Sequence, residues 1–308
     1  MTEAKPGTYD RNGARSPQWW PSRYGVDDQA GAANELTPER TLEALKIPQQ
    51  GRAIELALTL EPGIPAFPPR MWTQHILAHG TQEATMFGAG HSDTTYYEEQ
   101  VSQTYHIGCH LDGLAHVGIN GRYYNGNHYK DFYSPTEVTK LGIENARPWI
   151  CRGVVLDIAG LAGEEMLEGG FNITPDHLES ACERQGVEVQ AGDAVLLHTG
   201  WAALWMEDNE RFEAQEPGLG WDGAHWLTDR RVSVLGADNW ALEVIPFEDP
   251  NGIFVVHQHL LSETGTYIIE NIKTTELVES GRSEFLFVMT PLKIKGATGC
   301  PVSPVCVI

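Results

Sequence analysis

Residues 106–116, HIGCHLDGLAH, contain three of the twelve histidines of the chain together with one aspartate. His106, His110 and Asp112 stand at positions i, i+4 and i+6, so in an extended segment their side chains point the same way. A helix would turn Asp112 away from the two histidines, and Gly108 also disfavours a helix. Two imidazole nitrogens and a carboxylate oxygen are a usual donor set for a divalent ion. The segment therefore predicts a metal site with three protein ligands.

His116 lies four residues after Asp112. It could act as a fourth ligand or as a general base near the ion. The opposing interpretation is an ordinary loop of hydrogen-bonded polar residues, which the concentration of three histidines and an aspartate in one short stretch disfavours.

A second candidate segment is VHQHLLSETGTYIIENI, residues 256–272. His257 ends one apolar run, and Glu270 lies inside the next one. A buried carboxylate is costly unless it is paired or bound to a metal, so Glu270 is a candidate ligand. The alternative is an edge strand with Glu270 in water. His259 competes with His257, and spacing alone does not decide between them.

The elements that must position these residues are mostly strands. Two helices are predicted, over 37–46 and 174–186, because each begins with a Thr-Pro pair typical of a helix start. Apolar or β-branched runs predict seven strands: 53–60, 153–158, 194–199, 232–237, 252–257, 266–272 and 285–294. We expect a mixed, strand-rich α/β fold whose sheet is partly covered on both faces.

No Pro- or Ser-rich linker marks an interior boundary, so residues 1–308 are expected to form one domain with an irregular N-terminal arm over about 1–35. The net charge of −21 disfavours nucleic acid and anionic membranes as partners. No stretch reaches the ~18 apolar residues of a membrane span. The start lacks the apolar core of a secretion signal, and five scattered cysteines predict a reduced, cytoplasmic protein.

The segment HIGCHLDGLAH resembles the His-x-Gly-Thr-His-x-Asp-x-x-x-His signature of the metal-dependent cyclase family. That family includes kynurenine formamidases, isatin hydrolases and dienelactone-type hydrolases. HQHLLSETGTYIIEN resembles its later His-x-x-Leu-Leu…Glu-Asn pattern and favours His257 over His259. The segments RYGVDDQAGAANELTPE, AHVGINGRYYNG and LLHTGW resemble its longer members. One departure is Cys109, which stands where the family usually has threonine and offers a weaker hydrogen bond.

The resemblance implies a divalent ion, Mn or Zn, held by five residues: His106, His110, Asp112, His257 and Glu270. In two-metal members Asp112 and Glu270 would bridge the ions. His116 resembles the family's proton-shuttling histidine. The implied fold is a compact β/β/α (swivelling) arrangement in a homodimer or homotetramer. Metal-bound water as the nucleophile disfavours a thiol role for Cys109, although the departure leaves the orientation of the ligands open.

The implied activity is hydrolysis of a small molecule: opening of a cyclic amide, imide or lactone, or cleavage of an N-formyl amide. Phe67 in PGIPAFPPRMW resembles an aromatic residue placed over the substrate, with Trp72 as its neighbour. Packing of an exposed proline loop is the alternative for Phe67. Asp238 and Asn239 follow a predicted strand and could face the pocket.

Two other function classes stay open at this point. A non-haem iron oxygenase also uses two histidines and one carboxylate, which His106, His110 and Asp112 would supply. A non-catalytic metal- or ligand-binding protein would hold its ion tightly and would not need His116.

Overall fold

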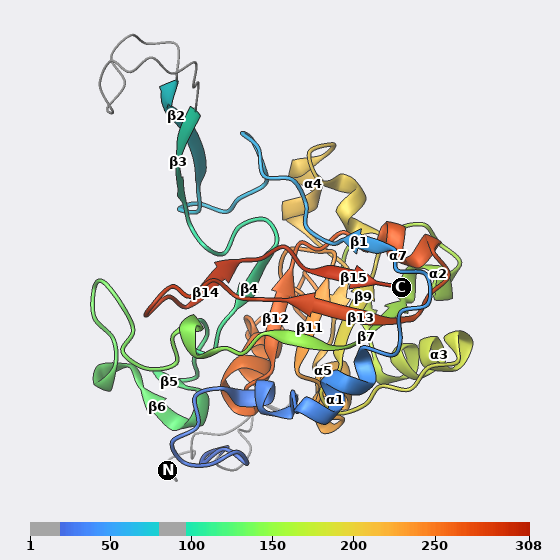
Figure 1. The fold of residues 1–308 in the computed structure, drawn as a ribbon, viewed down its shortest axis with the longest axis horizontal. Coiled ribbons are helices and arrows are strands. Elements are labelled where there is room, and N and C mark those ends of the chain that lie inside the picture. Colours follow the sequence, from blue (N-terminus) through green and yellow to red (C-terminus); the bar gives the residue numbers. More distant parts are fainter. Residues whose placement is uncertain (1–18, 80–96) are drawn as a thin grey trace, which may run out of the picture.

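The computed structural model describes residues 19–79 and 97–308. A curled, nine-stranded mixed sheet dominates it, in the order β1-β15-β13-β7-β9-β11-β12-β4-β14 (Figure 1). The strands of this sheet are β1 (Ala53–Glu55), β4 (His110–Asp112), β7 (Trp149–Asp157), β9 (Ala194–His198), β11 (Val234–Ala237), β12 (Tyr267–Glu270), β13 (Glu284–Met289), β14 (Gly299–Pro301) and β15 (Val305–Val307). The strand-rich α/β fold expected from the sequence is confirmed.

The middle of the sheet is parallel and its flanks are antiparallel. Strands β7, β9, β11 and β12 pair in parallel, as their continuous apolar sequences predict for strands buried on both faces. Strand β4 pairs antiparallel to β12 on one side and to β14 on the other. This pairing places the short β4 strand inside the sheet, where its backbone groups are satisfied from both sides.

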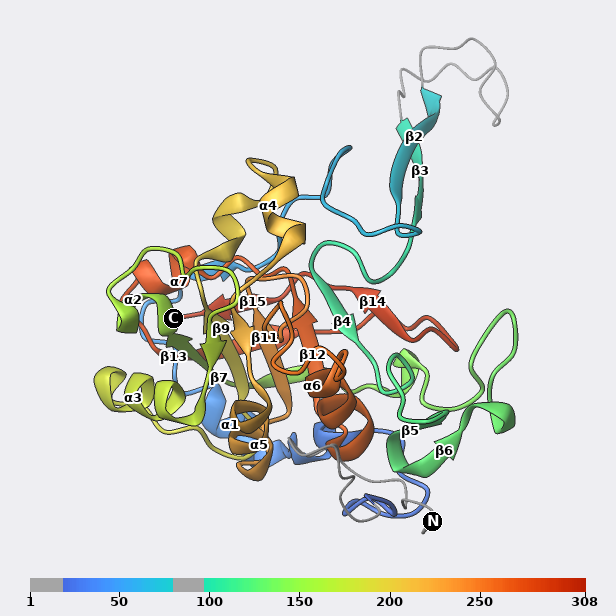
Figure 2. The same cartoon turned by 180° about the vertical axis from the view of Figure 1, so that it is seen from behind.

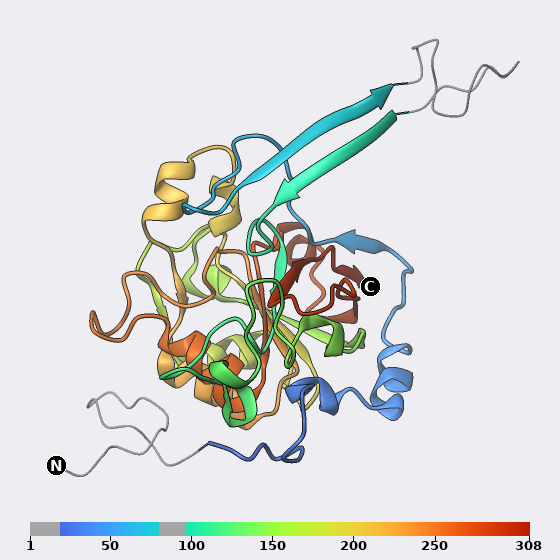
Figure 3. The same ribbon diagram turned by 90° about the vertical axis from the view of Figure 1, so that its left-hand side faces the viewer.

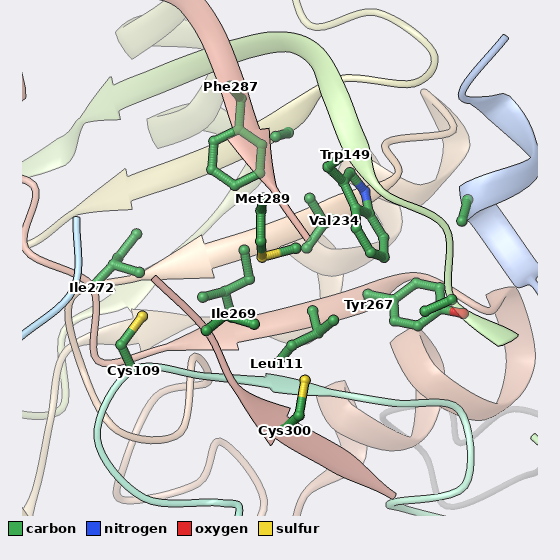
Figure 4. Close-up of a cluster of buried hydrophobic side chains, with 14 of the residues drawn as sticks. Cys109, Leu111, Trp149, Val234, Tyr267, Ile269, Ile272, Phe287, Met289 and Cys300 are labelled. Carbon is green, nitrogen blue, oxygen red and sulfur yellow. The ribbon is translucent and has the colours of Figure 1, made fainter. Parts of the chain in front are cut away.

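Alternate residues of the strands face two separate hydrophobic clusters. Leu111 and Ile269 belong to the first cluster, which the curl of the sheet closes with Trp149 and Phe287 (Figure 4). Ile268, the neighbour of Ile269, belongs to the second cluster on the opposite face. Helices cover that second face (Figure 2).

Seven α-helices connect the strands: α1 (Pro38–Ala44), α2 (Ile158–Ala162), α3 (Pro175–Gln185), α4 (Asn209–Ala214), α5 (Trp221–Asp229), α6 (Val255–His257) and α7 (Thr275–Glu279), all within the described residues. Short 3-10 helices are η1 (Gly31–Glu35), η2 (Tyr124–Gly126), η3 (Tyr129–Asp131), η4 (Ile143–Asn145) and η5 (Trp201–Leu204); η6 (Gln258–Thr264) is a π-helix. The two helices predicted from Thr-Pro starts are confirmed. Thr37 accepts the Arg40 backbone N–H at 3.3 Å, and Gly186 ends α3 at a left-handed φ of 66°.

The strand predicted over 252–257 is wrong, because this segment turns into α6 and continues directly as the π-helix η6. Phe254 starts the turn at a left-handed φ of 53°. The apolar run continues through Leu260 and Leu261, and both pack beneath the sheet. A short apolar run does not distinguish a buried strand from a buried helix, because it shows neither the two-residue nor the 3.6-residue hydrophobic periodicity.

A long hairpin leaves the body of the molecule. Strands β2 (Trp72–His79) and β3 (Tyr97–Gln103) pair with each other in a separate two-stranded sheet and project outward (Figures 1 and 3). Ile76 and Tyr97 are 61% and 63% exposed. Two further small sheets pair β5 (Arg122–Tyr123) with β6 (Asn127–His128) and β8 (Asn172–Ile173) with β10 (Gly218–Leu219).

The predicted N-terminal arm is irregular over residues 19–30 and ends in η1; its first 18 residues lie outside the described residues. Asn125 fastens the arm to the body, because its side-chain amide donates to the carbonyls of Gly25 and Val26 at 2.8 and 3.0 Å. No helix in the described ranges combines the length and the apolar character that a membrane span requires.

Candidate metal centre

Strand β4 carries two of the predicted ligands on one face. His110 and Asp112 are each 1% exposed, and Leu111 between them points into the first hydrophobic cluster. The antiparallel register places Glu270 of β12 directly opposite His110. Cross-strand neighbours lie within side-chain reach of each other, so pairing alone brings this carboxylate to the site.

Asp112 lies among the histidines of the 106–116 segment. Its Oδ1 is 2.6 Å from His106 Nδ1 and 3.3 Å from His110 Nε2. Its Oδ2 is 3.8 Å from both His116 Nε2 and His257 Nε2. The loop before β4 and the strand itself therefore converge on one carboxylate, as the even spacing predicts.

Glu270 joins the two halves of the site. Its Oε2 lies 3.2 Å from His110 Nε2, and its Oε1 lies 3.1 Å from His257 Nε2. His257 comes from α6, on the helix-covered side of the sheet. Residues more than 140 positions apart in the chain thus meet at a common point.

Hydrogen bonds orient the two buried imidazoles. His110 Nδ1 lies 2.7 Å from the Gly108 carbonyl, and His257 Nδ1 lies 2.6 Å from Glu243 Oε1. Each Nδ1–H donates to these acceptors, which leaves the Nε2 lone pair of both rings directed into the cluster. Such partners fix the tautomer of a metal-binding histidine and raise its basicity.

The backbone conformation explains why a glycine stands at position 108. Its φ of 57° is left-handed, and a Cβ there would clash with the Leu60 side chain. In this conformation its carbonyl accepts from His110 and also from Asn271 Nδ2, at 3.0 Å. The Gly108 carbonyl thus accepts from the predicted ligand His110 and from Asn271, the residue that follows Glu270.

The cluster fits a divalent ion. Among the described residues, ligand atoms of His106, His110 and Asp112 lie within 4.8 Å of one another, and so do those of Asp112, His257 and Glu270. His110 Nε2 and Asp112 Oδ2 are buried and have no hydrogen-bond partner within the described chain. Buried polar atoms are rarely left unpaired, and nitrogen with oxygen donors suits either Mn or Zn. The sharing of Asp112 by both groups gives the donor set for two ions as well as for one.

The protonation of the cluster depends on the same contacts. Burial alone would lower the pKa of His110, but Asp112 and Glu270 outweigh it and raise that pKa to about 10. Burial also opposes protonation of His257, yet Glu243 and Glu270 raise its pKa well above the usual range. Without a cation these histidines therefore retain protons, which a metal ion must displace on binding.

His116 is placed differently from the other histidines. Its ring stacks on His106 with centroids 3.6 Å apart, and its side chain is 23% exposed. Burial lowers its pKa to about 3, so the ring is neutral at pH 7. It lines a cavity of about 620 Å³ together with Thr298, whose Oγ1 lies 3.1 Å from His106 Nε2.

The structure separates the predicted substrate-lining residues. Phe67 packs against Trp240 with ring centroids 4.3 Å apart, and it shares a small cavity with His106. Trp72 begins the hairpin strand β2. Asp238 and Asn239 do not join the cluster.

Asp238 and Asn239 serve the scaffold instead. Both are buried. Asp238 accepts the backbone N–H groups of Thr199 and Gly200, and Asn239 Nδ2 donates to the Pro217 carbonyl. Neighbouring protein groups therefore engage the polar atoms of both side chains, which for Asp238 include the hydroxyls of Thr199 and Thr274.

His259 also lies apart from the metal cluster. Its Nδ1 contacts Glu263 Oε2 at 2.8 Å and its Nε2 contacts Thr228 Oγ1 at 2.8 Å. Of the two histidines of this segment, His257 is the one that lies in the cluster with Asp112 and Glu270.

Cys109 lies in the first hydrophobic cluster, near Ile272 (Figure 4). Burial raises the pKa of its thiol far above the usual range. A thiolate nucleophile needs a lowered pKa and access to a substrate, and this side chain has neither.

Sequence reasoning missed the residues that support the ligands. Glu243, which holds His257, is 2% exposed, and Asn271, which binds the Gly108 carbonyl, is 4% exposed. One signal was present for Glu243: a charge between Leu242 and Val244 in an apolar run. The partner of that charge is visible only in three dimensions.

Comparisons with known proteins show which family shares this fold. The sequence model of the Cyclase family matches residues 54–244. A crystal structure described as that of a novel cyclase is 32% identical, covers 93% of this chain and 96% of its own, and superposes with a TM-score of 0.86. A search of curated proteins gave no match.

Two more distant structures share the fold. Isatin hydrolase A from Ralstonia solanacearum is 20% identical, with 83% of this chain and 91% of that chain covered and a TM-score of 0.61. An isatin hydrolase bound to the product analogue thioisatinate is 18% identical, with 89% and 99% covered and a TM-score of 0.64. The family match over more than half of the sequence and the 32% identity over nearly all of it show that the chain belongs to the Cyclase family.

Proposed function

We propose that the protein is a metal-dependent hydrolase that opens a cyclic amide, imide or lactone, or cleaves an N-formyl amide. The observation that carries this proposal is that two buried ligand atoms, His110 Nε2 and Asp112 Oδ2, make no hydrogen bond within the described residues and lie beside a neutral histidine. The buried atoms supply a place for a cation. The neutral histidine, His116, supplies a group that can exchange a proton at the edge of that place.

The ligands we propose are His106, His110, Asp112, His257 and Glu270. A bound divalent ion supplies Lewis acidity and lowers the pKa of a water molecule towards ~7. The described side chains exclude bulk water from this place, because four of these five residues are buried. Hydrogen bonds from His110 to Gly108 and from His257 to Glu243 keep the donor atoms aimed inward.

His116 is the proposed proton shuttle. Its Nε2 lies 3.8 Å from Asp112 Oδ2, and the stacked His106 ring holds it in that direction. A neutral ring can take the proton that the attacking water loses. Because burial disfavours the protonated ring, it then gives the proton up readily to the leaving nitrogen or oxygen.

The comparisons support hydrolysis over the other classes. Solved structures with this fold are described as isatin hydrolases, and one as a potential metal-dependent hydrolase with cyclase activity. An oxygenase-type site uses two histidines and one carboxylate. Here His257 and Glu270 add a further imidazole and a further carboxylate to that set.

The test is anaerobic turnover by metal-depleted protein that has been reloaded with Mn or Zn. The substrates are an N-formyl arylamine, isatin, a dienelactone and a γ-lactam, and the readout is release of a carboxylate. Turnover under nitrogen that disappears in His116→Ala, with metal content unchanged, supports the proposal. Turnover that requires oxygen and Fe(II) contradicts it, and so does metal binding with no hydrolysis of any substrate.

We also propose a homo-oligomer. The β2–β3 hairpin exposes Ile76, Leu77 and Tyr97, and a two-stranded hairpin alone is only marginally stable in water. Contact with a second copy would cover these side chains. Light scattering should give two or four times the chain mass, and Ile76→Glu should lower it; a monomeric wild-type protein would contradict this.

A cytoplasmic location remains part of the proposal. All five cysteines are free and buried, as expected for a protein of a reducing compartment. Cell fractionation would test it.

A further inference from the structure

Thr298 is a polar residue beside the metal cluster that has no part in the ligand set or in the proposed mechanism. Its Oγ1 lies 3.1 Å from His106 Nε2. It also lines the cavity of about 620 Å³ whose wall includes His116. Thr298 therefore stands between this cavity and the ligand cluster.

The backbone fixes Thr298 relative to a predicted ligand. Its carbonyl accepts the Gly113 N–H at 2.8 Å, and Gly113 directly follows Asp112. The next residue, Gly299, pairs with Asp112 across strands β14 and β4. The Thr298 hydroxyl is therefore held in a defined position beside the strand that carries Asp112.

Gly299 leaves room for the His106 ring. A Cβ at position 299 would lie 2.6 Å from His106 Cε1 and 2.6 Å from the Leu111 carbonyl oxygen. Both distances are too short for real side chains, so a larger residue here would displace the ring. A glycine inside a strand often marks such a close approach. Thr298 and Gly299 together form a seat for the imidazole of His106.

The His106 ring is turned the opposite way from the other two ligand histidines. In His110 and His257, Nδ1 contacts the protein and Nε2 faces the cluster. In His106, Nε2 contacts Thr298 and Nδ1 lies 2.6 Å from Asp112 Oδ1. Thr298 is thus the group that determines which ring nitrogen of His106 faces the cluster.

A hydroxyl suits this position because it can donate as well as accept a hydrogen bond. When Nδ1 of His106 binds an ion, the ring hydrogen is on Nε2 and donates to Thr298 Oγ1. Without an ion, Nδ1–H donates to Asp112, and the Thr298 hydroxyl donates to Nε2. A methyl group in place of the hydroxyl could form neither bond with Nε2.

The same contact extends to the proposed proton shuttle. The rings of His106 and His116 are stacked, with centroids 3.6 Å apart and an angle of 14° between their planes. A rotation of the His106 ring would remove the surface on which His116 rests. The direction of His116 Nε2 toward Asp112 Oδ2, 3.8 Å away, therefore depends on His106 and, through it, on Thr298.

We propose that Thr298 is a positioning residue: it directs Nδ1 of His106 to the ion and, through the ring stack, holds His116 in the direction required for proton transfer. The first half of this proposal concerns metal binding alone. The second half rests on the proposed hydrolase function.

Metal affinity tests the first half. Thr298→Val nearly keeps the shape of the side chain and removes the hydroxyl, whereas Thr298→Ser keeps the hydroxyl. Competition against a chromogenic chelator should show about 10–100-fold weaker Zn binding in Thr298→Val, because Nε2 of a ligand histidine loses its partner. Thr298→Ser should retain most of the wild-type affinity. Wild-type affinity in Thr298→Val would overturn the proposal.

Thr136→Val is the matched control. Thr136 lines the same cavity, and its hydroxyl lies 3.4 Å from the Ser134 hydroxyl rather than beside a ligand histidine. The change of side chain is the same as in Thr298→Val. Its Zn affinity should equal that of the wild type, and an equal loss in both variants would overturn the assignment to Thr298.

NMR spectra of the ¹⁵N-labelled histidine rings separate a positioning role from a purely structural one. In Zn-loaded wild-type protein, we expect His106 to be coordinated through Nδ1 and the other ligand histidines through Nε2. Thr298→Ser should keep this pattern, and Thr298→Val should lose it. A purely structural role predicts lower stability with the pattern unchanged. Coordination of His106 through Nε2 in the wild type would overturn the proposal, even if Thr298→Val failed to fold.

Turnover tests the second half and separates this inference from the proposed function. With metal at saturation, kcat of Thr298→Val should still be lower by up to ~100-fold, because a misplaced reacting group costs rate. An unchanged kcat would overturn the second half. No hydrolysis by the wild type would reject the proposed function, and the second half with it, while the metal affinities and ring spectra would still decide the first half.

Discussion

Glu243 should control metal affinity through His257 without touching the ion itself. Its Oε1 accepts the His257 Nδ1–H at 2.6 Å and the His257 backbone N–H at 3.2 Å, and the side chain is buried. Glu243→Gln keeps the volume and an acceptor oxygen but removes the negative charge. The loss of such a partner typically lowers metal affinity 10–100-fold, or about 1.4–2.7 kcal/mol.

The chain provides a matched control at His259, two residues after His257. His259 contacts Glu263 at 2.8 Å, also within a buried pair, but lies outside the cluster. Glu263→Gln makes the same chemical change to a histidine–glutamate pair in the same segment. The metal affinity of the Glu263→Gln variant should equal that of the wild type.

The assay is competition for Mn and Zn against a chromogenic chelator at two pH values. Glu243 also favours a proton on the metal-free His257, and that proton competes with the ion. The variant escapes part of this competition, so its deficit should be larger at pH 8 than at pH 6. Unchanged affinity in Glu243→Gln would refute the reasoning, and a loss in Glu263→Gln alone would transfer the ligand role to His259.

Further perturbations have defined outcomes. His110→Ala should lose both metal and turnover, measured by metal analysis and rate; retention of both would refute the ligand set. His116→Ala should keep its metal and lose about 10²–10⁴-fold in kcat, the usual range for a positioned proton-transfer group, whereas an unchanged kcat would remove its role. Cys109→Thr should be as active as the parent, and native protein should resist thiol alkylation, because the thiol is buried. His259 has a pKa lowered to about 4 by burial, so its neutral form stabilises the fold above the unfolded value of ~6.5, and this contribution is lost as pH falls from there towards 4. Urea unfolding of metal-free protein should show a smaller loss between pH 7 and pH 5 in His259→Gln than in the wild type; equal losses would count against this assignment.

The local half of the site could be predicted because strand geometry relates sequence spacing to direction. His110 and Asp112 lie two residues apart on β4, and Leu111 between them is apolar, which is a pattern visible in one dimension. The distant half needed the family signature. The 252–257 segment is apolar enough for either a strand or a buried helix, so the strand prediction was wrong there, and only the family resemblance favoured His257 over His259.

The supporting residues could not be predicted, because their meaning depends on contacts across the chain. Glu243 is a charge within an apolar run whose partner the sequence does not show, and Asn271 looks like a polar residue after a strand. The hairpin was missed for a different reason. Its strands WTQHILAH and YEEQVSQ have no apolar face of the kind a core requires, so hydrophobic periodicity gave no signal.

The antiparallel register of β4 and β12 has a consequence for folding accuracy. A shift of one residue would exchange the inward and outward faces of β4, so Leu111 would replace His110 and Asp112 at the metal cluster. A chain that binds the ion in the cluster has therefore aligned these two strands correctly. Metal uptake is in that sense a check on assembly: it adds stability to the correct pairing and none to a shifted one.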